Sequence, residues 1–182
     1  LCNKVYSIDI NFKYYMVENG LSSNTVCAII QDSDGFIWVG TENGLNRFDG
    51  YQFLNFSNIP KNPASLVNNY VYALFEDNNK KLWIGTERGI SIYDLRLKSF
   101  RTFETQADDG TVIKGRIQNI FSDEQKQIWI NAGRQGVFAY NSEGIMKRYS
   151  FESEKNDTDK SIWINCIYKD KGNTIWASVN NT

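Results

Sequence analysis

Histidine is absent from this chain, and its 182 residues include only two prolines and three cysteines. Without histidine, and with no C-x-x-C spacing, the sequence has little material for a zinc site or a Cys–His nucleophile. We therefore predict no metal site, no cofactor and no thiol chemistry. Cys27 and Cys166 stand inside apolar strand patterns, which predicts two small buried side chains rather than a disulfide or reactive thiols.

An excess of either charge is also lacking, because Lys and Arg total 20 against 21 Asp and Glu. No basic block supplies the field that would hold a nucleic-acid backbone, so we predict no nucleic-acid partner. No stretch approaches the roughly 20 apolar residues that span a bilayer, and no charged and apolar leader opens the chain. We expect a soluble chain without a membrane segment, from which an export signal was removed or was never present.

What the chain does have is aromatic residues, at 14%, in a repeating arrangement. A tryptophan recurs at separations of 45, 46 and 47 residues, and an aspartate stands six residues before each one. The pairs are Asp32 and Trp38, Asp77 and Trp83, Asp123 and Trp129, and Asp170 and Trp176. Such a period is typical of a repeat architecture, and the aromatic content with few prolines favours strands.

Four apolar runs separated by turn formers make up the first repeat, at residues 26–32, 36–41, 45–48 and 53–56. The Asn, Asp and Gly residues between them tolerate the positive φ of tight hairpins, so consecutive runs are predicted to pair as antiparallel strands. The first run of each repeat is apolar on both faces. This pattern predicts sheets that are buried on both sides.

A β-propeller meets that demand, because each blade is packed between two others. We therefore predict an all-β fold of four-stranded antiparallel blades, with the tryptophan filling the gap between blades and small residues nearest the axis. The small positions are Ala28, Ala73, Asn119 and Cys166. Blades are predicted at residues 20–57, 66–104 and 113–151, with a partial blade at 161–182.

Residues 1–19 precede the first repeat and hold two short candidate strands, at 6–10 and 12–17. They are candidates for a segment that closes the ring. Because the fourth blade is partial, an unpaired edge and an apolar blade face are expected to be exposed. The chain is therefore predicted either to self-associate or to close as a small ring through its N-terminal strands.

The repeated aspartate has two interpretations. Asp32-x-Asp34-Gly35 resembles the start of a calcium loop, which would make it a ligand. The other copies lack the second aspartate, whereas a turn aspartate that accepts backbone N–H bonds explains all four copies. We predict the structural role.

Several motifs resemble the two-component regulator propeller repeat. Residues 20–24 read Gly-Leu-Ser-Ser-Asn, residues 36–41 read Phe-Ile-Trp-Val-Gly-Thr and residues 44–49 read Gly-Leu-Asn-Arg-Phe-Asp. The second copy is nearly as good, whereas the third has Asn131 and Ala132 in place of Gly-Thr. The resemblance covers roughly residues 12–182 and is most specific in the first half.

This resemblance implies a role in sensing. Such repeats form the periplasmic, extracytoplasmic sensor of hybrid two-component systems, in which a transmembrane helix leads to a histidine kinase. The ligand is commonly an oligosaccharide released from a polysaccharide, and the parent protein is expected to be a homodimer. Family sensors carry two seven-bladed propellers, so the chain would be the opening part of the first ring, partnered by the remaining blades.

Propellers generally bind ligands at one end of the axis, on the loops that lead into the first strand and that join the second strand to the third. The residues on these loops are Asn24, Glu42, Asn43, Asn69, Glu87, Arg88, Arg116, Arg134, Gln135 and Trp163. Planar polar groups with an aromatic plate suit sugar hydroxyls, and arginine grips carboxylate or sulfate. The alternative is that they are ordinary solvated loop residues.

Two other functions remain open. The Asp-x-x-Gly-x-x-Trp turn resembles the Asp-box of sialidases, which suggests a glycan-cleaving propeller. Such an enzyme needs an arginine cluster and a Tyr–Glu pair at the axis. Arg88, Arg116 and Arg134 are available, but nothing in the sequence singles out the Tyr–Glu pair, so no catalytic residue is predicted. The third interpretation is a propeller that serves only as a protein-interaction platform.

Overall fold

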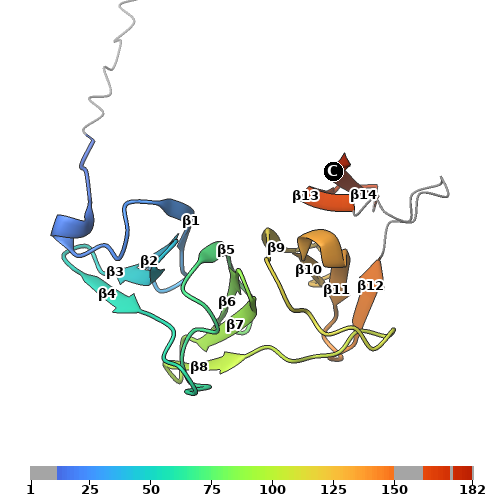
Figure 1. Ribbon diagram of the computed structural model, residues 1–182, viewed down its shortest axis with the longest axis horizontal. Coiled ribbons are helices and arrows are strands. Elements are labelled where there is room, and N and C mark those ends of the chain that lie inside the picture. The colour runs from blue at the N-terminus through green and yellow to red at the C-terminus, as the bar shows by residue number, and fades with distance from the viewer. Residues whose placement is uncertain (1–11, 150–161, 173, 182) are drawn as a thin grey trace, which may run out of the picture.

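The computed structural model describes residues 12–149, 162–172 and 174–181. They form three four-stranded antiparallel sheets and one two-stranded sheet, which follow one another along an arc (Figure 1). Each sheet is one blade, or part of one, and consecutive strands of a blade are neighbours in it. This arrangement confirms the predicted all-β fold and its antiparallel blades.

The strand bounds follow the apolar runs closely. Blade 1 consists of β1 (Val26–Gln31), β2 (Ile37–Thr41), β3 (Gly44–Phe48) and β4 (Phe53–Phe56). Blade 2 consists of β5 (Val71–Glu76), β6 (Lys81–Thr86), β7 (Gly89–Asp94) and β8 (Ser99–Thr102). Blade 3 consists of β9 (Asn119–Ser122), β10 (Ile128–Asn131), β11 (Val137–Tyr140) and β12 (Met146–Tyr149). Blade 4 has β13 (Ile162–Lys169) and β14 (Ile175–Asn181), and two 3-10 helices are η1 (Val17–Asn19) and η2 (Gly133–Gln135).

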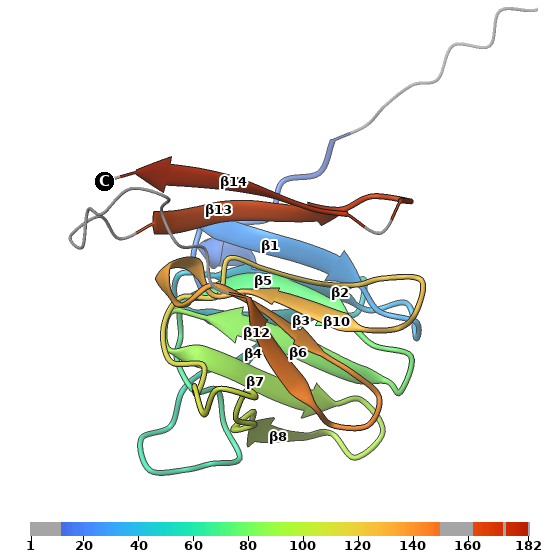
Figure 2. The ribbon, with the colours of Figure 1, turned by 90° about the vertical axis from the view of Figure 1, so that its right-hand side faces the viewer.

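The first strand of each blade lies on the inner side of the arc, and the fourth strand of each complete blade lies on the outer side (Figure 1). β5 contacts β1 on one side and β9 on the other. Because consecutive strands in a blade are antiparallel, the loops that lead into the first strands and those that join second to third strands lie at the same end of the propeller axis. Figure 2 shows this end at its left, where η2 lies beside the start of β13.

The repeated aspartate satisfies donors of both the backbone and the indole. Asp32 Oδ1 accepts the backbone N–H groups of Asp34 and Phe36 at 3.0 and 2.9 Å, and Oδ2 accepts the Trp38 indole N–H at 2.7 Å. The other three indole–carboxylate distances are 3.0, 2.8 and 2.8 Å. One carboxylate thus binds the tryptophan of its own repeat and backbone N–H groups of the turn, a geometry that fits the predicted structural role.

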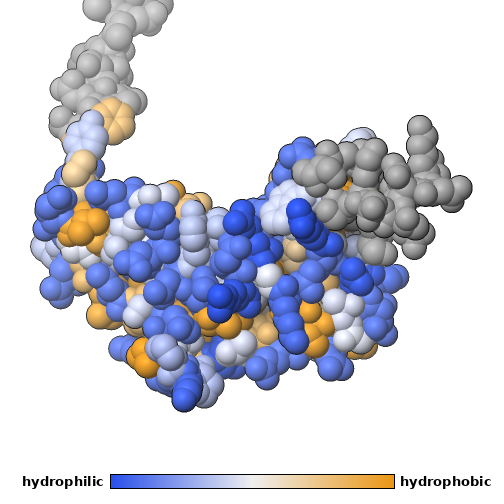
Figure 3. All heavy atoms as spheres, viewed as in Figure 1, coloured by the Kyte–Doolittle hydropathy of each residue, from blue (hydrophilic) through white to orange (hydrophobic). Residues whose placement is uncertain are grey.

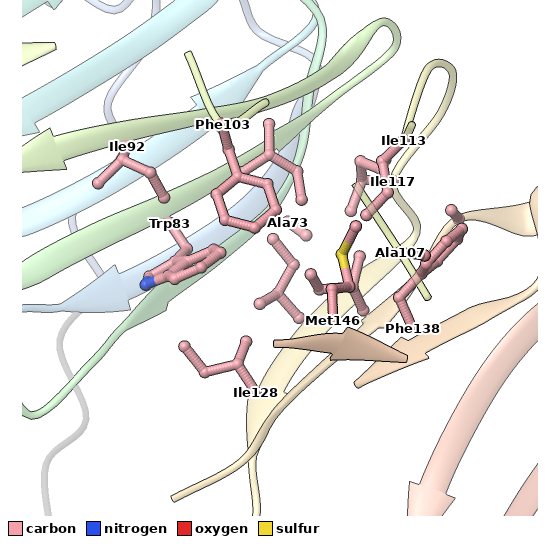
Figure 4. Packing of buried hydrophobic residues seen from close by; sticks show 14 residues of the cluster. Ala73, Trp83, Ile92, Phe103, Ala107, Ile113, Ile117, Ile128, Phe138 and Met146 are labelled. Atoms are coloured by element: carbon pink, nitrogen blue, oxygen red, sulfur yellow. The ribbon is translucent and has the colours of Figure 1, made fainter. Parts of the chain in front are cut away.

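Apolar side chains from adjacent blades form the core between them. Between blades 2 and 3, Trp83 packs against Phe103 at 4.9 Å between ring centroids, and Ile128 belongs to the same cluster (Figure 4). The blades approach so closely that a Cβ on Gly85 would lie 2.7 Å from Cγ2 of Ile117. Glycine at this position therefore sets the spacing of blades 2 and 3.

Two predictions about burial are wrong. Cys27 and Cys166 are exposed, because the inner strands that carry them border the open hollow of the arc. β1 is also exposed over much of its length, with Ile29 at 68%, because blade 1 has a described neighbour on one face only. Trp176 is 62% exposed for the same reason at the other end of the arc, whereas Trp38 is fully buried.

The segment before blade 1 differs from the expectation. Residues 12–16 form no strand, and the chain then turns through η1, so the strand predicted at 12–17 is absent. The candidate strand at 6–10 lies outside the described residues. Tyr15 packs edge-on against Phe48 and Phe53 on the free face of blade 1. The predicted small closed ring is not formed, because the arc is open in Figure 1.

In the described residues, no helix has the length and apolar character required to cross a membrane.

Candidate functional site

A β-bulge recurs near the start of three inner strands. The pairing of β1 with β2, β5 with β6 and β13 with β14 each skips one residue, and the extra residues are Cys27, Tyr72 and Asn165. A bulge residue has no partner on the neighbouring strand and interrupts the regular alternation of side chains between the two faces of the sheet, so its side chain can point in a different direction. In blade 2 this places Tyr72 beside Arg116 of blade 3, with the guanidinium 4.6 Å from the ring centroid.

Around this contact, blades 2, 3 and 4 contribute one group of polar and aromatic side chains at the inner rim. We call it the Arg116 cluster, and its members are Tyr70, Tyr72, Glu87, Arg116, Arg134 and Trp163. Arg116 Nε donates to Glu87 Oε2 at 2.8 Å. Tyr70 and Tyr72 stack with ring centroids 4.3 Å apart and planes at 9°. Figure 3 looks along the propeller axis onto the end that carries this cluster, and it shows strongly hydrophilic side chains beside the hollow of the arc.

Trp163, near the start of β13, joins blade 4 to the cluster. The guanidinium groups of Arg116 and Arg134 each lie 5.7 Å from its ring. A Cβ on Gly133 would lie 3.2 Å from the indole, so glycine in η2 lets the ring approach the backbone. The tryptophan is thereby fixed where it can hold both cations through cation–π attraction.

The cluster's protonation states follow from its contacts. Burial raises the pKa of Tyr72, and hydrogen bonds with Glu87 and Tyr70 raise it further. Burial alone would raise the pKa of Glu87, but hydrogen bonds from Arg116 and Tyr72 outweigh it, and the pKa lies below its ordinary value. The hydrogen bond to Glu87 raises the pKa of Arg116. At neutral pH the cluster therefore holds a neutral phenol, a carboxylate and guanidinium cations.

The structure brings together four of the ten residues predicted for this end: Glu87, Arg116, Arg134 and Trp163. Arg88 is exposed next to them, and its charge helps to lower the pKa of Glu87. The two cluster members that sequence reasoning missed are Tyr70 and Tyr72. The sequence does show two tyrosines at the start of an inner strand. It does not show the direction of the Tyr72 side chain, because that direction depends on the bulge.

The other five predicted residues make bonds within the fold. Asn69 Oδ1 accepts the Asn58 N–H at 2.6 Å, and Gln135 Oε1 accepts the Lys114 N–H at 2.7 Å. These side chains hold loops in place. The remaining three lie in or next to the loops of blade 1, where Asn24 accepts from Val17, Glu42 accepts from Ser23 and Asn43 donates to Ser22.

At the opposite end of the propeller axis, a cavity of about 510 Å³ lies between blades 3 and 4. Its wall includes Lys169, which is 10% exposed, bonds to Asp123 and Gln125, and lies 5.4 Å from the Trp129 ring. These contacts join blades 3 and 4, and the ammonium group of Lys169 is already paired with the carboxylate of Asp123.

Within the described ranges, no three His, Cys, Asp or Glu side chains gather closely enough to hold a metal ion.

Two segments of the chain, residues 20–43 and 65–88, match the family model described as Two component regulator propeller. These are the first two predicted repeats, so the resemblance seen in the motifs is confirmed there. Over 63 residues the chain is 40% identical to Histidine kinase P4 of Formosa agariphila. That alignment covers 35% of this chain and 5% of the kinase.

Solved structures share the fold. One is the extracellular domain assigned to a hybrid two component system of B. thetaiotaomicron, with a TM-score of 0.71 and 24% identity over 91% of this chain and 29% of that one. Another is the extracellular domain assigned to a one component system of the same organism, with a TM-score of 0.65 and 25% identity over 90% and 21%. The chain thus spans less than a third of the length of these relatives, and the likeness confirms the propeller fold.

Proposed function

We propose that this chain, with its two component regulator propeller repeats, is part of the periplasmic sensor domain of a hybrid two-component system. In this proposal it binds an oligosaccharide derived from a glycan, and the parent protein passes the signal to a cytoplasmic histidine kinase. The match to a histidine kinase and the extracellular structures with the same fold support the sensor context. The remaining blades of the ring and a second copy of the parent are its proposed partners.

The observation that carries the proposal is the Arg116 cluster. Sugars are bound by planar polar side chains that reach paired hydroxyl groups and by aromatic rings that lie against their C–H faces. The cluster supplies both kinds of group from three blades at one end of the axis, with the polar groups fixed by Glu87–Arg116 and by the Tyr70–Tyr72 stack. Side chains held in place before binding lose little freedom when the ligand arrives.

The test is oligosaccharide binding by the chain and by an Arg116→Gln variant, measured by isothermal titration calorimetry. We expect the variant to bind at least tenfold more weakly, because it loses a charged donor and frees Glu87. Arg96→Gln is the matched control, since Arg96 is exposed in the turn between β7 and β8. If the folded Arg116→Gln variant binds as tightly as wild type, the oligosaccharide does not bind at this cluster.

A glycan-cleaving enzyme is the second candidate, and one observation favours it. The structure brings a Tyr–Glu pair, Tyr72 and Glu87, next to Arg116, with Arg88 near, which sequence reasoning had not singled out. The electrostatics oppose a nucleophilic role, because the pKa of Tyr72 is raised and Glu87 is held ionised by Arg116. Turnover of a fluorogenic sialoside that is lost in Tyr72→Phe would establish the enzyme. Binding without turnover supports the sensor.

A propeller that serves only as a protein-interaction platform is the third candidate. It requires no small ligand at the rim. Pull-down of the rest of the sensor by this chain, together with an absence of binding to any oligosaccharide in the calorimetric test, would favour it over the sensor proposal.

A further inference from the structure

The two arginines on Trp163 differ in their charge partners. Arg116 is paired with Glu87 at 2.8 Å, and its charge is therefore largely balanced. Arg134 is exposed, and among the described residues no carboxylate lies within ion-pair distance of it. Its guanidinium group lies over the Trp163 ring and leaves its N–H donors available.

The rim around Arg134 is positively charged. Arg88, Arg116 and Arg134 face a single carboxylate, Glu87, within this group. Arg88 lies near enough for its charge to act on Glu87, and its side chain is exposed. An approaching anion would therefore meet uncompensated positive charge at the hollow of the arc.

We infer that the oligosaccharide bound at the Arg116 cluster carries an anionic group, either a uronate carboxylate or a sulfate ester, which binds to Arg134. This inference rests on the proposed function and specifies its class of ligand. The planar guanidinium of Arg134 presents parallel N–H donors that match two oxygens of either group. Arg88 adds attraction over a longer range and need not touch the sugar.

Trp163 and Gly133 prepare Arg134 for this role. Gly133 precedes Arg134 in η2, and the absence of its side chain lets the indole lie against the backbone there. The cation–π contact then restricts the arginine before the ligand binds, which lowers the entropy cost of binding. A neutral sugar gains nothing from this cation, so the site is expected to discriminate by charge.

The experiment uses three tetrasaccharides of similar size: tetragalacturonate, a sulfated galactan tetrasaccharide and uncharged cellotetraose. Calorimetric titrations of the chain at about 20 and about 200 mM NaCl give the affinities. We expect one acidic probe to bind at least tenfold more tightly than cellotetraose, and its affinity to fall at the higher salt concentration because exposed charges are screened. Tight binding of tetragalacturonate identifies the anionic group as a carboxylate, and tight binding of the sulfated galactan tetrasaccharide identifies it as a sulfate ester.

Arg134→Gln keeps the size of the side chain and removes its charge, and Arg96→Gln removes an exposed arginine outside the cluster. We expect Arg134→Gln to lose at least tenfold in affinity for the acidic probe and Arg96→Gln to lose less than twofold, with melting temperatures unchanged. Full acidic affinity in Arg134→Gln overturns the inference. Tight binding of cellotetraose alone overturns it but leaves the proposed function standing, whereas binding of none of the three probes rejects both for this chain.

Discussion

Asp123 shows how a single carboxylate serves more than one donor. It accepts the backbone N–H of Gln127 and the indole N–H of Trp129, as its counterparts do in other repeats, and also the ammonium group of Lys169 from blade 4. The turn bonds were predictable from the spacing of Asp and Trp. The lysine was not, because it lies 46 residues away and its approach depends on how blade 4 packs on blade 3.

Replacing this carboxylate tests its contribution to stability. Asp123 and Lys169 are nearly buried, and Asp123→Asn leaves the ammonium group with Gln125 but without a charged partner, so the substitution is expected to cost about 1 to 3 kcal/mol at pH 7. Burial opposes ionisation of Asp123, but bonds from Lys169 and Trp129 prevail, and its pKa lies below the ordinary 3.8. The stability from this group is therefore present above pH 3.8 and lost as the pH falls through the folded pKa.

Urea unfolding at pH 7 and at pH 3 measures both effects. We expect the gap between wild type and Asp123→Asn to narrow at pH 3, because this pH lies below the ordinary carboxyl pKa of 3.8 and the carboxyl of the unfolded wild-type chain takes up a proton there. Glu124→Gln changes the exposed neighbour and should stay within about 0.5 kcal/mol of wild type. A gap that is the same at both pH values would contradict the explanation.

At the scale of elements, the spacing between blades depends on one position in each second strand. Gly40 and Gly85 occupy it in blades 1 and 2, where a Cβ would lie 2.6 and 2.7 Å from the next blade. Blade 3 has Asn131 instead, whose amide donates to the Ile164 carbonyl at 3.2 Å. The departure from the Gly-Thr motif thus exchanges close packing for a hydrogen bond between blades.

Gly85→Ala tests the close approach. The added methyl group meets the branched Ile117 side chain of blade 3, and we expect a loss of about 1 to 3 kcal/mol in the free energy of unfolding. Chemical denaturation provides the measurement. Ser142→Ala, at the exposed turn between β11 and β12, is the control and should change stability by less than about 0.5 kcal/mol. An equal effect of the two substitutions would show that the contact between blades is not the cause.

Sequence reasoning located the strands better than the site. The strands of blade 1 lie within one residue of their predicted bounds, because alternation and turn chemistry act between near neighbours in the chain. The Arg116 cluster joins residues from three blades, whose contacts are distant in the sequence. Tyr72 reaches Arg116 because of a bulge, and the residue types at the bulge do not predict it. Cys27 was misassigned for a related reason, since the apolar pattern of its strand does not reveal that the inner side borders open space.

At the scale of the whole molecule, the arc presents an unpartnered face on blade 4. Trp176 is 62% exposed and Tyr168, its partner across the strands, is 65% exposed, whereas Trp38 on the equivalent face of blade 1 is fully buried by blade 2. Large aromatic surface of this kind favours association. The self-association predicted from the sequence remains a prediction for this chain.

Analytical ultracentrifugation over a range of concentrations tests it. We expect the chain to associate as concentration rises and Trp176→Lys to remain monomeric, because the lysine places a charge in the apolar face. Tyr51→Lys is the matched control, since Tyr51 is 95% exposed in the turn between β3 and β4 and should leave association unchanged. A wild-type chain that is monomeric throughout the range would reject the prediction.

The recurring bulge separates what the propeller must keep from what it is free to vary. Positions 27, 72 and 165 carry cysteine, tyrosine and asparagine on the same local backbone, so the ladder tolerates residues of very different chemistry there. In each case the bulge residue has no partner in the ladder, so the pairing of the two strands does not depend on its side chain. Propellers built on this repeat can therefore change the side chain at this position while their architecture stays constant.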